Sequence, residues 1–152
     1  MTTYSIAELS NMLHLTASTL RYYEEIGLLP PVERSSSKQR IYTNAHIDRI
    51  HAIICFKNAG MSISDIQKFF TYESDELAHI HDMLDLLDSY QRDTLYKLQE
   101  EIKAYAHLLR KIDFYHEIAA SFDQHTAHPK WEDYDDRDYL QQAKQDLELS
   151  LS

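Results

Sequence analysis

The stretch Leu15-Thr-Ala-Ser-Thr-Leu-Arg-Tyr-Tyr-Glu-Glu-Ile-Gly-Leu-Leu-Pro-Pro31 decides the fold of this chain. Thr16 can cap a short helix that runs to about Ile26, because its hydroxyl can accept a hydrogen bond from a free N–H of the first turn. Gly27 suits the left-handed position that ends such a helix, and the two prolines that follow exclude any continuation. The stretch therefore predicts one short helix with a sharp exit.

A second short helix is expected just upstream. Ser5-Ile-Ala-Glu8 has the form of a capping box, in which a hydroxyl and a carboxylate three residues apart pair with the free N–H groups of a first turn. Ile6, Leu9 and Leu13 then recur at the spacing of one helical face. Two short helices joined by a turn of a few residues form a helix-turn-helix.

Downstream, the pattern predicts a β-hairpin over residues 31–42, because a Ser35–Lys38 turn is followed by alternating polar and apolar residues. This hairpin would be the wing of a winged helix-turn-helix. Capping residues then predict a third helix over residues 43–59, with Gly60 as its stop, and a fourth helix from Ser62 to about Phe70.

From residue 76 onward the pattern changes to that of one long helix. Apolar residues recur mostly at alternating steps of three and four, which is typical of a coiled-coil seam. A helix from about residue 76 to about residue 122 cannot bury such a seam by itself, so we expect the same helix of a second copy as its partner. The predicted seam consists of Leu77, Leu84, Leu87, Gln91, Leu98, Ile102, Tyr105, Leu109 and Ile112.

Composition limits the class of protein. The 152 residues carry a net charge of −10, but residues 1–72 hold seven Lys and Arg against six Asp and Glu. The acidity therefore belongs to the C-terminal half, and the N-terminal half remains free to bind nucleic acid. The chain has a single cysteine, which suits a reducing compartment, and it shows no long apolar stretch and no secretory signal. These features together predict a cytoplasmic protein without a membrane partner. We find no nucleophile–base pair, phosphate-binding glycine loop or metal-ligand motif, so we expect no enzyme activity, cofactor or metal.

The Leu15–Pro31 stretch resembles the signature of the MerR family of transcription regulators. Arg40-Ile-Tyr42 resembles the wing of that family, and the segment that ends Asn58-Ala-Gly-Met-Ser-Ile63 resembles its second pair of helices. The match is close over residues 4–70 and extends to the long helix by pattern only. One departure lies in the wing, where the family often has a glycine and this chain has Ser37-Lys38-Gln39.

The resemblance implies a mainly α fold in three parts. A winged helix-turn-helix DNA-binding domain would occupy residues 1–75, and a long antiparallel coiled-coil dimerisation helix would occupy residues 76–122. Residues 123–152 would form a short acidic tail, either disordered or capping the neighbouring subunit. The family binds double-stranded promoter DNA as a homodimer at pseudo-palindromic sites, and it acts on RNA polymerase indirectly by distorting the DNA.

DNA contacts are expected on the recognition helix, the wing and the third helix. Short polar side chains at the start of a recognition helix can reach base edges, while Arg, Lys and Tyr can reach phosphates. The predicted contacts are Ala17, Ser18, Thr19, Arg21, Tyr22, Tyr23, Arg34, Lys38, Arg40, Tyr42 and Lys57. We also expect one of Tyr22 and Tyr23 to lie mainly in the core. Arg34 and Lys38 are interpreted equally well as ordinary solvated charges.

Cys55 is the candidate sensor. Its context, Ile53-Ile-Cys55-Phe-Lys-Asn-Ala-Gly-Met-Ser, resembles the aldehyde- and electrophile-responsive branch of the family, in which a lone cysteine lies on this helix. A thiolate can attack an electrophilic carbon, which would make the protein a stress-response regulator. The alternative is that Cys55 is a small buried hydrophobe among Ile53, Ile54 and Phe56.

Two further hypotheses remain open at this point. In the first, C-terminal histidines and acidic residues respond to a metal or small ligand; His125-Thr-Ala-His128 has a suitable spacing if that segment is helical. In the second, the protein is a dimeric helical adaptor that binds protein rather than DNA. An adaptor has no reason to carry the predicted cations on helix, wing and third helix at once.

Overall fold

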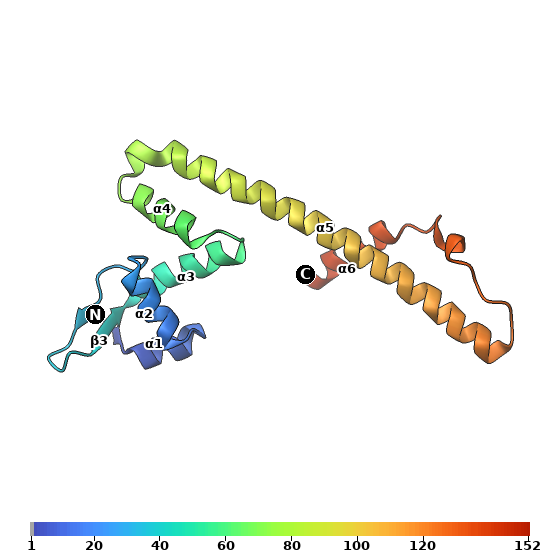
Figure 1. Cartoon of the computed structure of the whole chain (residues 1–152), viewed down its shortest axis with the longest axis horizontal. Helices are drawn as coiled ribbons and strands as arrows, with labels where there is room; N and C mark the ends of the chain where they lie inside the picture. Colours follow the sequence, from blue (N-terminus) through green and yellow to red (C-terminus); the bar gives the residue numbers. More distant parts are fainter. Residues whose placement is uncertain (1) are drawn as a thin grey trace. The chain divides into compact units, whose positions relative to one another are not determined.

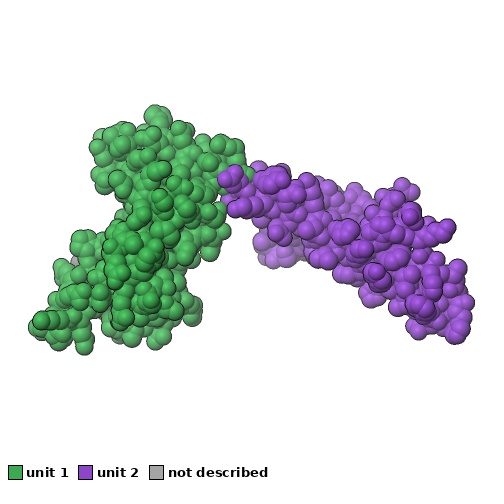
Figure 2. Space-filling view, viewed as in Figure 1, with its two compact units in different colours: residues 1–92 green, residues 93–152 purple. Residues whose placement is uncertain are grey.

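The computed structural model describes residues 2–152. The chain divides at residue 92 into two compact units, the second of which is residues 93–152 (Figure 2). Six α-helices dominate the described part of the chain, with three short strands near its start (Figure 1). The predicted fold class, a mainly α protein with a helix-turn-helix and a long helix, is confirmed. No helix among the described residues has both the length and the apolarity needed to cross a bilayer.

The helix-turn-helix consists of α1 (Ile6–Leu13) and α2 (Ala17–Glu25), and both begin at the predicted caps. The Ser5 hydroxyl accepts from the N–H of Glu8 at 3.3 Å, while the Glu8 carboxylate accepts from the N–H of Ser5 at 2.7 Å. These bonds from Ser5 hold the pKa of Glu8 below its usual value. Gly27 follows α2 with φ of +75°, in the left-handed conformation predicted for it.

The wing consists of β2 (Glu33–Arg34) and β3 (Arg40–Thr43), paired antiparallel as predicted. A third strand, β1 (Thr3–Tyr4), pairs with the other edge of β3, so the strand order is β1-β3-β2. The sequence did not indicate β1, because two residues are too few to show an alternating pattern.

Two further helices, α3 (Asn44–Asn58) and α4 (Ile63–Glu73), complete the first unit; α4 extends a few residues beyond its predicted end. His46 is buried at the start of α3 and links it to the wing. Its Nδ1 accepts from the N–H of Thr43 at 3.0 Å, so its Nε2 is the donor to the carbonyl of Pro31 at 3.3 Å. The core of this unit includes Leu9, Leu20, Leu28, Ile50, Ile53 and Ile66.

The long helix α5 (Glu76–Gln124) has close to its predicted bounds. Within the first unit its early turns are fixed to α4 by one tyrosine. The Tyr90 hydroxyl donates to the Asp65 carboxylate at 2.6 Å and accepts from the N–H of Ser62 at 3.2 Å. The bond from Tyr90 is the main reason that the pKa of Asp65 lies below its usual value.

The acidic C-terminal segment is folded, so the first of the two alternatives expected for it, a disordered tail, is wrong. It contains a 3₁₀ turn (Trp131–Tyr134) and the helix α6 (Tyr139–Leu151), which lies antiparallel to α5 of the same chain. Tyr139 donates to Asp113 of α5 at 3.0 Å, and Tyr105 of α5 donates to Asp146 at 2.9 Å. The segment therefore covers its own α5 instead of extending into solvent.

Cations of α5 hold the 3₁₀ turn in place. The Trp131 ring lies 4.0 Å from the Arg110 guanidinium and 4.3 Å from the Lys111 ammonium. Arg110 also donates to the Trp131 carbonyl at 2.9 Å and pairs with Asp135. Tyr134, in the same 3₁₀ turn, is buried, and this burial is the main reason that its pKa is raised to about 12.

Part of the predicted seam of α5 needs correction. Ile102 and Leu109 are half-buried beside α6, because α6 packs along that side of the helix. Two rows of apolar residues at strict seven-residue spacing remain exposed on a neighbouring face of α5 in the second unit. The first row is Leu98, Tyr105 and Ile112, and the second row is Leu108, Tyr115 and Phe122.

Candidate nucleic-acid interface

The outer face of α2 presents short and long polar side chains together. Leu20 is fully buried and points the other way, so Ser18, Arg21 and Tyr22 face outward, with Tyr22 46% exposed. Thr19 is half-buried, and its hydroxyl lies 2.8 Å from that of the capping Thr16. Ala17, also half-buried, begins the helix. This face has the chemistry of a recognition helix, with a small N-terminal end and a planar cation one turn later.

A cationic cavity of about 380 Å³ lies beside this face. Arg21 of α2, Lys38 of the wing tip and Arg40 of β3 line it, opposite the first residues of α1. Arg21 and Lys38 bring positive charge, and the helix start adds the partial positive charge of its N–H groups, so the cavity favours an anion, although Glu8 already accepts from the N–H of Ser5 and Glu24 from Arg40. The start of α1 was not among the predicted site residues, although its capping box marks a helix N-terminus there.

Glu24 of α2 organises the arginines of the wing. Its carboxylate accepts from Arg40 Nε at 2.5 Å and lies 3.7 Å from Arg34. The bond to Glu24 is the main cause that holds the pKa of Arg40 above its ordinary value. Arg34 and Arg40 are also directly paired in the β2–β3 register. The wing and the recognition helix are therefore joined through a partly exposed charge cluster, a connection that residue spacing did not reveal.

The wing tip is a tight turn with Lys38 at its critical position. The N–H of Lys38 donates to the carbonyl of Ser35 at 2.8 Å, and the N–H of Ser35 donates to the carbonyl of Gln39 at 2.8 Å. Lys38 has φ of +62°, a left-handed conformation that glycine adopts without strain. The chain thus keeps the turn without a glycine and places a lysine ammonium at the tip.

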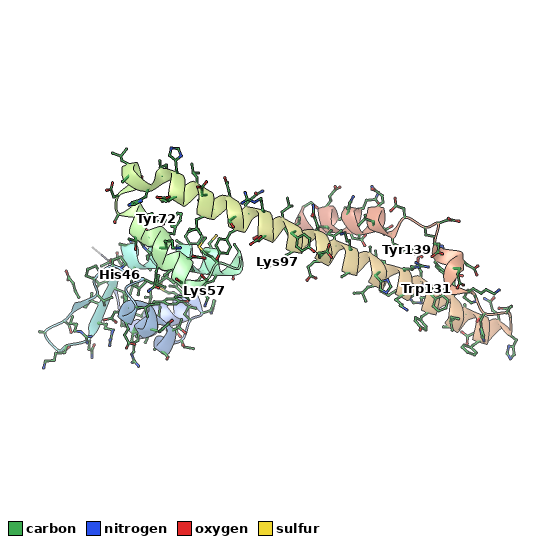
Figure 3. All side chains as sticks on the ribbon, turned by 45° about the horizontal axis from the view of Figure 1, so that its top comes forward. His46, Lys57, Tyr72, Lys97, Trp131 and Tyr139 are labelled. Atoms are coloured by element: carbon green, nitrogen blue, oxygen red, sulfur yellow. The ribbon has the colours of Figure 1, made fainter. Side chains whose placement is uncertain are left out.

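Two predicted DNA contacts lie in the core, and the prediction of direct contact is corrected for them. Tyr42 is 0% exposed, and its burial, reinforced by the nearby Glu24 carboxylate, raises its pKa. Tyr23 is 2% exposed, whereas Tyr22 is on the surface; one tyrosine of this pair is in the core, as expected. The Tyr23 hydroxyl accepts from Lys57 Nζ at 3.4 Å, so Tyr23 positions a cation of α3 (Figure 3).

Cys55 is exposed on α3, so the interpretation of it as a buried hydrophobe is wrong. Ile53, two residues earlier, is fully buried in the core. The cysteine therefore projects from a helix whose other face packs into the core of the first unit. His51, one turn before Cys55, is exposed as well.

The C-terminal histidines lack the helical spacing on which the metal hypothesis depended. The helix α5 ends at Gln124, and His125 has φ of +55°, so the segment from His125 to His128 is not helical. His128 Nδ1 lies 2.6 Å from the Ser121 hydroxyl, and its ring packs on Phe122. Over residues 2–152, no three His, Cys, Asp or Glu side chains converge as metal ligands.

Comparisons with known proteins agree with this geometry. The model of the "MerR HTH family regulatory protein" family matches residues 4–73. An HTH-type transcriptional regulator of Haemophilus influenzae is 32% identical over 121 residues, which cover 78% of this chain and 87% of that protein. The crystal structure of HiNmlR, described as a MerR family regulator lacking the sensor domain and bound to promoter DNA, has a TM-score of 0.65 and 31% identity. The matched part covers 78% of this chain and 90% of the HiNmlR chain.

A further relative is similar over the N-terminal part. The HTH-type transcriptional regulator AdhR of Bacillus subtilis is 45% identical over 67 residues, or 44% of this chain. Those residues span about half of that relative, 48% of its length.

Proposed function

The chain belongs to the MerR family of DNA-binding transcriptional regulators, and from this premise we propose that it binds promoter DNA as a homodimer and controls transcription there. The observation that carries the proposal is the cavity lined by Arg21, Lys38 and Arg40 beside the exposed face of α2. These cations come from separate elements and converge on one surface, as contacts to a DNA backbone require.

The division of roles follows from side-chain chemistry. Arg21, Arg40 and Lys38 neutralise phosphates and set the position of α2 in the major groove. Ser18 and Tyr22 face the base edges, where a hydroxyl can donate or accept and an aromatic edge can pack on a thymine methyl group. Lys57, held by Tyr23, adds a phosphate contact from α3.

Two copies read the site together. The exposed heptad rows of α5, including Leu108, Ile112 and Tyr115, require a partner helix, and a second copy supplies an identical one. A two-fold dimer presents two α2 helices and binds a pseudo-palindromic site. We propose that it acts in the cytoplasm on RNA polymerase indirectly, by distorting promoter DNA rather than by enzymatic chemistry.

The test is DNA affinity as a function of salt, measured by fluorescence anisotropy on the promoter next to the gene. Arg21→Ala removes one exposed cation per copy, so the slope of log K against log salt should fall by about 2 for the dimer. Lys103→Ala is the matched control, because Lys103 is an exposed cation of α5 paired only locally with Glu100. An Arg21→Ala slope equal to that of the control would refute the site.

We further propose that Cys55 is the sensor of this regulator. Its exposure on α3 gives a small electrophile access to the sulfur. The thiolate attacks the carbonyl carbon of an aldehyde, a C–S bond forms, and the carbonyl electron pair moves to oxygen, which takes a proton and gives a hemithioacetal. The added atoms change the packing around α3, and this favours the dimer conformation that holds distorted DNA.

A transcription assay separates the sensor from the DNA-binding surface. Cys55→Ser should bind the promoter with the affinity of the wild type and lose its response to formaldehyde or methylglyoxal. His51→Ala, one turn away on the same helix and also exposed, is the control that should keep both properties. A Cys55→Ser protein that still responds to aldehyde would exclude this sensor.

A further inference from the structure

An apolar groove of about 450 Å³ runs between α5 and α6, wholly within residues 93–152. Leu98, Ile102 and Tyr105 form its α5 side, and Ala143 and Leu147 form much of its α6 side. Most of the lining is carbon, so contact with water is unfavourable in a single copy. The groove is therefore a surface in need of an occupant.

The helix α6 has two contact faces. One face lies on α5 through the buried Ala143 and the hydroxyl–carboxylate bond between Tyr105 and Asp146. The other carries Leu140, Leu147 and Leu151, which recur at seven- and four-residue steps and remain exposed. At 3.6 residues per turn the leucine row lies roughly 60° from Ala143, so the two faces adjoin. A helix with apolar faces at that angle fits one corner of a four-helix bundle.

The helix α5 shows the same division. One side carries α6, and the neighbouring side carries the exposed heptad row of Leu98, Tyr105 and Ile112. Leu98 and Tyr105 also line the groove, so the heptad seam and the groove form one continuous apolar surface. Whatever covers Leu98 and Tyr105 therefore also reaches the groove, which Leu147 of α6 lines from the other side.

We propose that a second copy of this chain occupies the groove, so that α6 is part of the subunit interface and two α5–α6 pairs form a four-helix bundle. This inference rests on the homodimer proposed above and adds α6 to it. The shared lining favours the same occupant. Leu98 and Tyr105 belong both to the exposed heptad row and to the groove, so a second α5 that covers the row also reaches the groove; the exposed Lys97 marks the adjoining turn of α5 (Figure 3).

The test is sedimentation equilibrium on the full chain with a matched pair of substitutions on α6. Leu147→Glu places a charge in the groove, whereas Leu149→Glu places the same charge on a residue that is 76% exposed and does not line it. We expect the dimer dissociation constant to rise at least about tenfold for Leu147→Glu and to stay within about twofold of the wild type for Leu149→Glu.

Two controls keep the result decisive. Emission from Trp131, the only tryptophan, reports whether the C-terminal segment stays on α5; if Leu147→Glu shifts it, Leu147→Ala replaces it in the same comparison. Leu108→Glu, in the second exposed row of α5 and outside the groove, tests the homodimer itself. If Leu108→Glu dissociates the dimer and the Leu147 variant matches Leu149→Glu, the inference is overturned and the homodimer stands. A wild type that sediments as a monomer overturns both.

Discussion

Lys38 adopts a backbone conformation that its side chain opposes. The left-handed region costs a residue with a Cβ roughly 1 kcal/mol, and the hydrogen bonds of the Ser35 turn hold Lys38 there. We expect Lys38→Gly to stabilise the folded protein by roughly 0.5–1 kcal/mol, measured by denaturant unfolding. The same substitution should weaken DNA binding, because the wing tip loses its cation.

Lys38→Gln separates these two effects. Glutamine removes the charge and keeps the backbone strain, so Lys38→Gln should lower DNA affinity as much as Lys38→Gly without the gain in stability. If Lys38→Gly were less stable than the wild type, the strain at this position would be disproved.

Tyrosines show where sequence reasoning about the site succeeded and failed. The outward position of Tyr22 and the buried position of Tyr23 follow from helical spacing, because Leu20 and Tyr23 share one face. Tyr42 was misassigned, since in a strand of four residues either face can be the inner one until its neighbours are known. Cys55 was equally ambiguous: its apolar sequence neighbours suggested burial, yet it is exposed.

At the scale of elements, one hydrogen-bonded tyrosine joins α4 to the early turns of α5. Tyr90→Phe removes the hydroxyl that bonds to Asp65 and Ser62, so we expect a loss of about 1–2 kcal/mol in the free energy of unfolding near neutral pH. The pKa of Asp65 is lowered in the folded protein, so its contribution is present above the unfolded pKa of ~3.9 and is lost as pH falls through the folded pKa.

The measurement is urea unfolding of wild type and Tyr90→Phe across a pH series. The difference between the two proteins should be largest above about pH 5 and should shrink below about pH 4. Tyr96→Phe is the control, because Tyr96 lies on the same helix and is exposed. A Tyr90→Phe deficit that is constant with pH would show that Asp65 is not the group involved.

Elements stabilised by local contacts were predictable, and those stabilised by distant contacts were not. Ser5, Thr16 and Ser62 cap their helices through bonds within three residues, which spacing alone reveals. The strand β1 exists because β3 lies beside it. The segment that contains α6 is ordered partly because Arg110 and other cations of α5 hold it, and acidic composition alone suggests disorder.

At the scale of the whole molecule, the exposed heptad rows of α5 make stability depend on concentration. If a second copy covers them, association stabilises the folded state by mass action, and the melting temperature should rise with protein concentration. Circular dichroism melts across an about hundredfold dilution series test this. Leu108→Glu should melt at one temperature throughout, and a wild type that does the same would contradict the dimer.

The bond between Glu24 and the wing arginines has a consequence for how the regulator finds its promoter. Arg34 and Arg40 already have an anionic partner when no DNA is present. If Arg40 binds a phosphate as proposed above, that bond competes with the bond to Glu24, so the phosphate contact gains less free energy at random sequence and at the promoter alike. The base contacts proposed for α2 then supply a larger share of the affinity, which sharpens the discrimination between the promoter and other DNA.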